Sequence, residues 1–162
     1  MHIRHIVYSL PAGAASRILW LPPLLARIAV GWVFASTGWG KLHDLEQVIG
    51  FFAELGIPLP ALQAPLVAST ELICGLLLLA GLGTRIAALP LIGTMVVAIA
   101  TAHWASVDSA AALLGLVETL YVVFLAWLSI SGPGPVSLDA IFEREADSLA
   151  TAAVRTPMPL RS

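Results

Sequence analysis

The amino-acid sequence predicts an all-α membrane protein: an antiparallel four-helix transmembrane bundle with an interfacial helix between the first and second spans. Composition is the first reason. Of 162 residues, 59% are hydrophobic and 11% are charged, whereas soluble domains are about 45–50% apolar and about 25% charged. Spacing is the second reason, because the apolar residues gather in four stretches of about 20, the length that a helix needs to cross a bilayer.

Charge and cysteine content exclude several classes of function. The net charge is −2 and the chain has eight lysines and arginines, too few for a basic patch that binds nucleic acid. The single cysteine, Cys74, excludes an intramolecular disulfide, a CxxC redox pair and a cysteine zinc cluster. The sequence contains no convincing haem, flavin or metal motif, so we expect no metal site.

The four spans are predicted at residues 22–42, 62–81, 85–104 and 110–130, within a membrane domain that covers residues 22–135. The second and third spans are joined by a very short link, which makes them antiparallel neighbours.

The link between the first and second spans has a different pattern. Leu45, Val48, Phe52 and Leu55 recur at helical spacing among acidic residues. This pattern predicts a short amphipathic helix that lies in the membrane interface.

Both termini are predicted to be cytoplasmic. Residues 1–21 form an uncleaved N-terminal segment, because their apolar piece is too short for a signal peptide. Residues 136–162 form an amphipathic tail that is disordered at its end. Six of the eight basic residues fall on the side of the termini, which is the cytoplasmic side by the positive-inside rule.

Two glutamates lie deep in the predicted spans. At about 1.5 Å per residue, Glu71 and Glu118 are about 12–13 Å from the outer ends of their spans. A charge near the bilayer centre costs at least about 2.5–3.5 kcal/mol. Both side chains should therefore face the bundle interior, either paired or protonated, and Lys41 is the natural partner for one of them. The alternative is that both glutamates only fix helix register.

The first span has a distinctive face. Arg27, Gly31, Phe34, Gly38 and Lys41 are spaced by four, three, four and three residues, so they share one side of a helix. The two glycines allow another helix to approach closely.

This R-x3-G-x2-F-x3-G-x2-K pattern resembles the first helix of the DoxX family of small integral membrane proteins. Further pieces match in order, namely Gly56–Pro58, Gly81–Arg85, Gly132–Gly134 and Ser137–Asp139. The resemblance covers residues 24–140. Family members include a subunit of a thiosulfate:quinone oxidoreductase, DoxD-like proteins and a partner in a membrane oxidoreductase complex linked to thiol redox homeostasis.

The resemblance implies a quinone-linked oxidoreductase subunit in the bacterial inner membrane. Electrons would come from a small sulfur compound, a thiol or a partner protein. Under this hypothesis Glu71, Glu118 and Lys41 are the catalytic residues, and the glutamates carry the protons. The candidates for binding the quinone are Arg27, Trp39, His103 and Tyr121.

Each of these residues also has a structural interpretation. Arg27 and Lys41 can reach toward the membrane surfaces, while the rings of Trp39, His103 and Tyr121 are typical of the interface or the core. Two other function classes therefore stay open. The chain could be a non-catalytic scaffold or assembly partner for a redox or metal-handling system, or a subunit of a small-solute transporter that forms a homo-oligomer.

Overall fold

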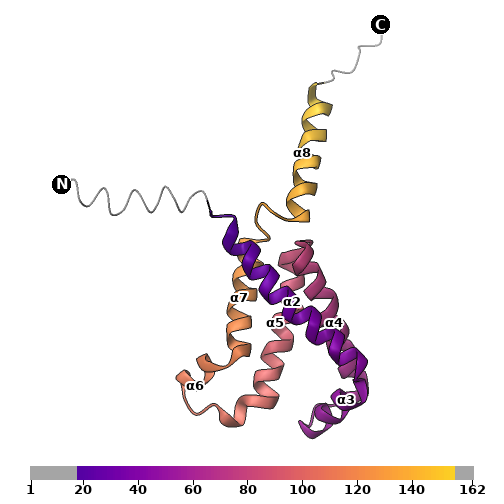
Figure 1. Ribbon diagram of the computed structural model, residues 1–162, viewed down its shortest axis with the longest axis vertical. Coiled ribbons are helices and arrows are strands. Elements are labelled where there is room, and N and C mark those ends of the chain that lie inside the picture. Colours follow the sequence, from indigo (N-terminus) through magenta and orange to yellow (C-terminus); the bar gives the residue numbers. More distant parts are fainter. Residues whose placement is uncertain (1–17, 156–162) are drawn as a thin grey trace, which may run out of the picture.

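The computed structural model describes residues 18–155, and this part of the chain is helical and contains no strand. The prediction of an all-α protein is confirmed. Figure 1 shows a bundle with α3 and α6 at one end and α8 extending beyond the other. The helices are α2 (Leu21–His43), α3 (Leu45–Glu54), α4 (Pro60–Ala80), α5 (Thr84–Ala98), α6 (Ala110–Gly115), α7 (Val117–Ser131) and α8 (Leu138–Arg155).

Three helical segments in the described residues are long and apolar enough to cross a membrane. They are Leu21–His43, Pro60–Ala80 and Thr84–Ser106. The third is α5 continued by a π-helix, Ile99–His103, and a 3-10 turn, Trp104–Ser106. Prolines occupy the first turns of α2 and α4, where a missing N–H leaves no helical hydrogen bond unmade.

The fourth apolar stretch is divided. It was predicted as one helix over residues 110–130, but the backbone is extended at Leu116 (φ −71°, ψ 137°), between α6 and α7. Gly115 weakens the helix before the break. The Thr119 hydroxyl stabilises the break, because it donates a hydrogen bond to the Leu113 carbonyl at 2.7 Å. With 15 residues, α7 is shorter than the three long segments. The four-span bundle therefore stays a prediction.

Helix α3 occupies the region predicted as an interfacial helix and has no buried residue. Its position in the membrane interface stays a prediction, because the structure contains no lipid. Helix α8 lies within the predicted amphipathic tail. Residues 1–17 and 156–162, which include most of the predicted N-terminal segment and the predicted disordered end, lie outside the described residues.

Glycines set the close packing of α2 on α4. A Cβ atom added to Gly31 would lie 3.0 Å from the Gly75 carbonyl oxygen, and one added to Gly38 would lie 2.8 Å from the Ala68 carbonyl oxygen. The face that the sequence predicts on the first span is thus the face that packs on α4. Small residues allow such close approach of membrane helices.

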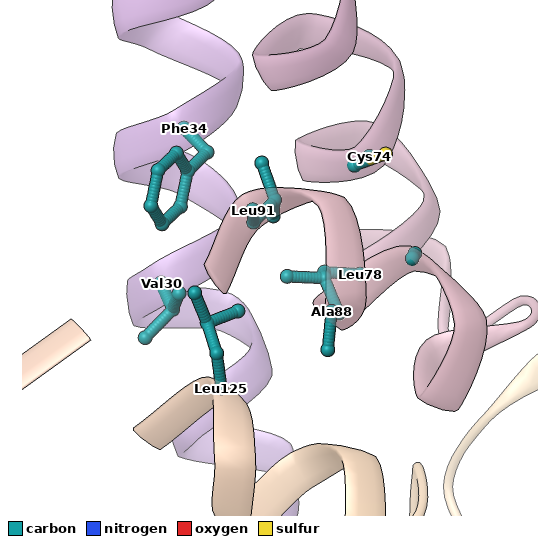
Figure 2. Close-up of a cluster of buried hydrophobic side chains, with 8 residues drawn as sticks. Val30, Phe34, Cys74, Leu78, Ala88, Leu91 and Leu125 are labelled. Carbon is teal, nitrogen blue, oxygen red and sulfur yellow. The ribbon is translucent and has the colours of Figure 1, made fainter. Parts of the chain in front are cut away.

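The apolar core lies between α2, α4, α5 and α7. Figure 2 shows part of this core, in which Val30, Phe34, Leu91 and Leu125 belong to one cluster of buried side chains. The remaining members of this cluster are Cys74, Leu78, Ala87 and Ala88. The core positions the four helices that carry the ionisable residues.

A polar cluster joins α8 to the end of the bundle. The buried Arg27 side chain donates to the Val136 carbonyl at 2.6 Å. The Asp139 carboxylate accepts from the backbone N–H of Gly83 at 2.9 Å, and the Asp139 N–H donates to the Gly81 carbonyl at 3.1 Å. These contacts connect α2, the α4–α5 turn and the start of α8.

We expect Gly81→Ala to destabilise the protein more than Gly83→Ala. Both glycines have positive φ, 68° and 56°, which costs an alanine about 1–2 kcal/mol. A Cβ at Gly81 would also collide with the Arg27 guanidinium, whereas nothing in residues 18–155 lies within 4 Å of a Cβ at Gly83. The added overlap should cost about 1–3 kcal/mol more. Unfolding midpoints of the two variants in detergent measure the difference in stability. Equal shifts of the midpoint would contradict the prediction that overlap with Arg27 adds to the cost at Gly81.

Candidate functional site: an ion pair in the wall of an apolar cavity

The centre of the candidate site is an ion pair between Lys41 on α2 and Glu71 on α4. Lys41 Nζ lies 2.7 Å from both Glu71 Oε1 and Oε2. The Glu71 side chain is 2% exposed and that of Lys41 is 33% exposed. The sequence predicts that Lys41 pairs with one of the two deep glutamates, and the structure pairs it with Glu71.

A third residue, Thr37, completes the polar contacts of this pair. Its hydroxyl lies 3.2 Å from Glu71 Oε2 and also 3.2 Å from the Phe34 carbonyl oxygen. Sequence reasoning did not single out Thr37. Its signal is its position one helical turn before Lys41, which places both side chains on the same side of α2.

A cavity of about 590 Å³ lies beside the ion pair, between α2, α3, α4 and α5. Pockets of roughly 300–1,000 Å³ with mostly apolar walls and a few polar groups are typical of small-molecule sites. The polar lining residues are Lys41, Gln47, Gln63, Thr70, Glu71, Thr94 and Thr101. The other walls are mainly apolar, so this cavity suits a largely apolar ligand.

The rim of the cavity includes exposed apolar side chains. Phe51, Leu66 and Val97 line the cavity and are at least half exposed. Leu66 and Val97 belong to segments long enough to span a membrane, so their exposed surfaces suit lipid. A molecule dissolved in the bilayer could therefore reach the ion pair without crossing water.

A second ionisable pair lies near the same end of the bundle. His103 Nε2 lies 3.3 Å from Glu118 Oε1, and both side chains are partly exposed. His103 ends the π-helical segment Ile99–His103, a form of helix that is common at functional sites. Neither residue lines the cavity, although Thr101 and Ala102 of the same segment do.

The other sequence-predicted binding residues lie away from the cavity. Tyr121 packs edge-on against Phe34, with ring centroids 5.5 Å apart. Trp39 is 58% exposed, and its ring lies against His43. Arg27 precedes Lys41 by about 21 Å along α2 and holds the α8 end of the bundle. The structure thus brings together Lys41 with Glu71 and His103 with Glu118, but does not place all the candidates around one cavity.

The described residues contain no group of three or more histidine, cysteine or acidic side chains that could hold a metal ion. Cys74 is buried in the apolar core, one helical turn from Glu71. Lys41, Glu71 and the nearby threonine hydroxyls place hydrogen-bond donors and acceptors in the wall of the cavity.

The long apolar helices and the buried ion pair define an integral membrane protein in contact with lipid. Residues 23–104 match the DoxX family. The chain belongs to this family, as the resemblance in its sequence predicts. No solved structure matches the chain significantly.

Three curated proteins illustrate the relationship. An uncharacterized membrane protein of Mycobacterium tuberculosis is 36% identical over 141 residues, covering 77% of this chain and 85% of the relative. The "Inner membrane protein YphA" of Escherichia coli is 31% identical over 132 residues, covering 78% and 92%. The "Putative oxidoreductase CatD" of Bacillus subtilis is 34% identical over 118 residues, covering 72% and 83%.

Proposed function

We propose that this protein is a quinone-linked oxidoreductase subunit of the bacterial inner membrane. It would pass electrons from a small sulfur compound, a thiol or a partner protein to quinone. The observation that carries the proposal is the apolar cavity with the Lys41–Glu71 pair in its wall. The name of the Bacillus subtilis relative, which contains the word oxidoreductase, supports the same class of activity.

The residues around the cavity fit a quinone. Its ring is flat and apolar, and its two carbonyl oxygens accept hydrogen bonds. The lysine ammonium has three N–H donors, and two suffice for the two contacts with Glu71, which leaves one for a ligand. Because the pair has no net charge and no other charged residue among residues 18–155 lines the cavity, the site favours a neutral head group.

The two ion pairs would have different roles. When bound, a quinone accepts two electrons and two protons, and a donor such as a pair of thiols that form a disulfide supplies the same numbers. Lys41 would hold a proton on Nζ beside the ligand, and Glu71 would orient the ammonium and stabilise its charge. The partly exposed His103–Glu118 pair would exchange protons between the site and water.

The proposed orientation follows from the distribution of basic residues. Both termini are cytoplasmic, and the end with α3 and α6 faces the outer side. The name of the Escherichia coli relative supports an inner-membrane location. We also propose that the subunit acts in a membrane complex with a partner protein or as a homo-oligomer.

The proposal predicts that quinone co-purifies with the protein and is lost on Glu71→Gln. The amide keeps the shape of the side chain but carries no negative charge, and only one of its two polar atoms can accept from the ammonium, so Lys41 is held less firmly beside the ligand. Lipid extraction after purification in mild detergent gives quinone per protein. We expect near-stoichiometric quinone in the wild type and clearly less in the variant, because the loss of one charge-assisted hydrogen bond raises the Kd about tenfold.

Glu118→Gln is the matched control, because Glu118 is a paired glutamate that does not line the cavity. It should retain quinone and reduce turnover. If the wild type holds no quinone above the lipid background, the proposal is wrong, and the scaffold or transporter alternatives become the leading hypotheses.

A further inference from the structure

The threonine hydroxyls around the cavity are not equivalent. Thr94 donates to the Leu91 carbonyl at 2.9 Å, and Thr101 donates to the Val97 carbonyl at 2.8 Å. Such bonds to the preceding turn are the usual arrangement for threonine within a helix. The Thr70 hydroxyl makes no hydrogen bond with any residue between 18 and 155, although Thr70 lines the cavity and precedes Glu71 in the chain.

The two glutamines that line the cavity are placed differently from Thr70. The Gln63 amide donates to the Pro58 carbonyl at 2.7 Å, and Gln47 is exposed on α3. Thr70 is half-buried. Because Thr70 lines the cavity and its hydroxyl makes no bond to the preceding turn, that hydroxyl is available to a polar atom of a ligand in the cavity.

We propose that Thr70 is a specificity-determining residue, whose hydroxyl binds a polar oxygen of the ligand while the third N–H of Lys41 binds another. The inference rests on the proposed function and identifies the ligand more closely. It is a neutral, membrane-dissolved molecule with two oxygen acceptors on an apolar ring.

The two contacts respond differently to the redox state of such a ligand. An ammonium only donates, whereas a hydroxyl can donate or accept. Lys41 therefore favours the oxidised form, which carries carbonyl oxygens. Thr70 can bind both forms, because its hydroxyl can rotate to accept from the hydroxyl of the reduced form.

Isosteric substitutions test the role of Thr70. Decylubiquinone and menadione are titrated into the purified full-length protein in detergent, and the Kd is measured for the wild type, Thr70→Val and Thr94→Val. Thr94 is the matched control, because it is also half-buried at the same cavity but its hydroxyl is already bonded to Leu91. We expect Thr70→Val to raise the Kd about threefold to tenfold. Thr94→Val should change the Kd by about twofold or less.

Thr70→Ser should bind with most of the wild-type affinity, because serine keeps the hydroxyl. Unfolding temperatures establish that all variants are folded. If the wild type binds neither probe, the proposed function fails and the role of Thr70 fails with it. If the wild type binds but Thr70→Val binds equally well, only the role of Thr70 is refuted. The same follows if Thr70→Ser binds as weakly as Thr70→Val.

Discussion

Lys41→Met is expected to destabilise the protein by about 3–5 kcal/mol, because it leaves the Glu71 carboxylate buried without its cation. Glu71 is 2% exposed, so water cannot replace the lost contacts. The reverse change, Glu71→Leu, should cost less. Lys41 is 33% exposed, and its long side chain can turn its charge toward water. The free energy of unfolding in detergent micelles measures both effects.

The double variant Lys41→Met/Glu71→Leu is the control for this prediction. Replacing both members of a buried ion pair with apolar residues is often neutral or even stabilising. We therefore expect the double variant to recover most of the stability that Lys41→Met loses, although it should not bind quinone. A double variant as unstable as Lys41→Met would show that the pair contributes little and that Lys41 stabilises the fold in another way.

Gly75→Ala is expected to destabilise the protein by about 3 kcal/mol, because it overpacks the contact between α2 and α4. A Cβ at Gly75 would collide with the Ala35 backbone nitrogen and would lie 2.9 Å from the Gly31 carbonyl oxygen. Both are backbone atoms of a helix and cannot move aside as a flexible side chain can. The helices must then separate, which also draws Lys41 away from Glu71, so quinone binding should fall together with stability.

Gly40→Ala on α2 provides a control of opposite sign. Within the described part of the chain nothing lies within 4 Å of a Cβ at Gly40, and alanine favours a helix over glycine by about 1 kcal/mol. Thermal unfolding should therefore show a small gain for Gly40→Ala and a large loss for Gly75→Ala. Losses of similar size at both positions would mean that the close approach of α2 and α4 does not limit stability.

Much of the helical structure could be predicted because its causes are local. The apolar stretches, the prolines at the starts of α2 and α4 and the glycines between α4 and α5 act over a few residues. The face from Arg27 to Lys41 was also visible, because helical spacing alone places these residues on one side. The break at Leu116 was missed, because hydropathy does not reveal it: a hydrogen bond from the Thr119 side chain to the Leu113 carbonyl, only six residues away, stabilises the interruption.

The charged residues of the candidate site could be predicted from the sequence, but their arrangement in space could not. Depth within the spans singled out Glu71, Glu118 and Lys41, because a charge in lipid requires a partner. Which glutamate meets Lys41 depends on the glycine contacts between α2 and α4, and these join residues thirty or more positions apart. The sequence likewise grouped Arg27 with Lys41, although their positions near opposite ends of α2 place them in different polar clusters.

The amino-acid sequence is enough to identify this chain as a helical membrane protein of the DoxX family with ionisable residues in its spans. The pairing of those residues, the place of the cavity and the unbonded hydroxyl of Thr70 emerge only in the folded molecule. These features differ in the range of the interactions that produce them. Helix formation and membrane burial depend on neighbouring residues, whereas a cavity and its free hydrogen-bonding groups exist only once α2, α3, α4 and α5 have packed together.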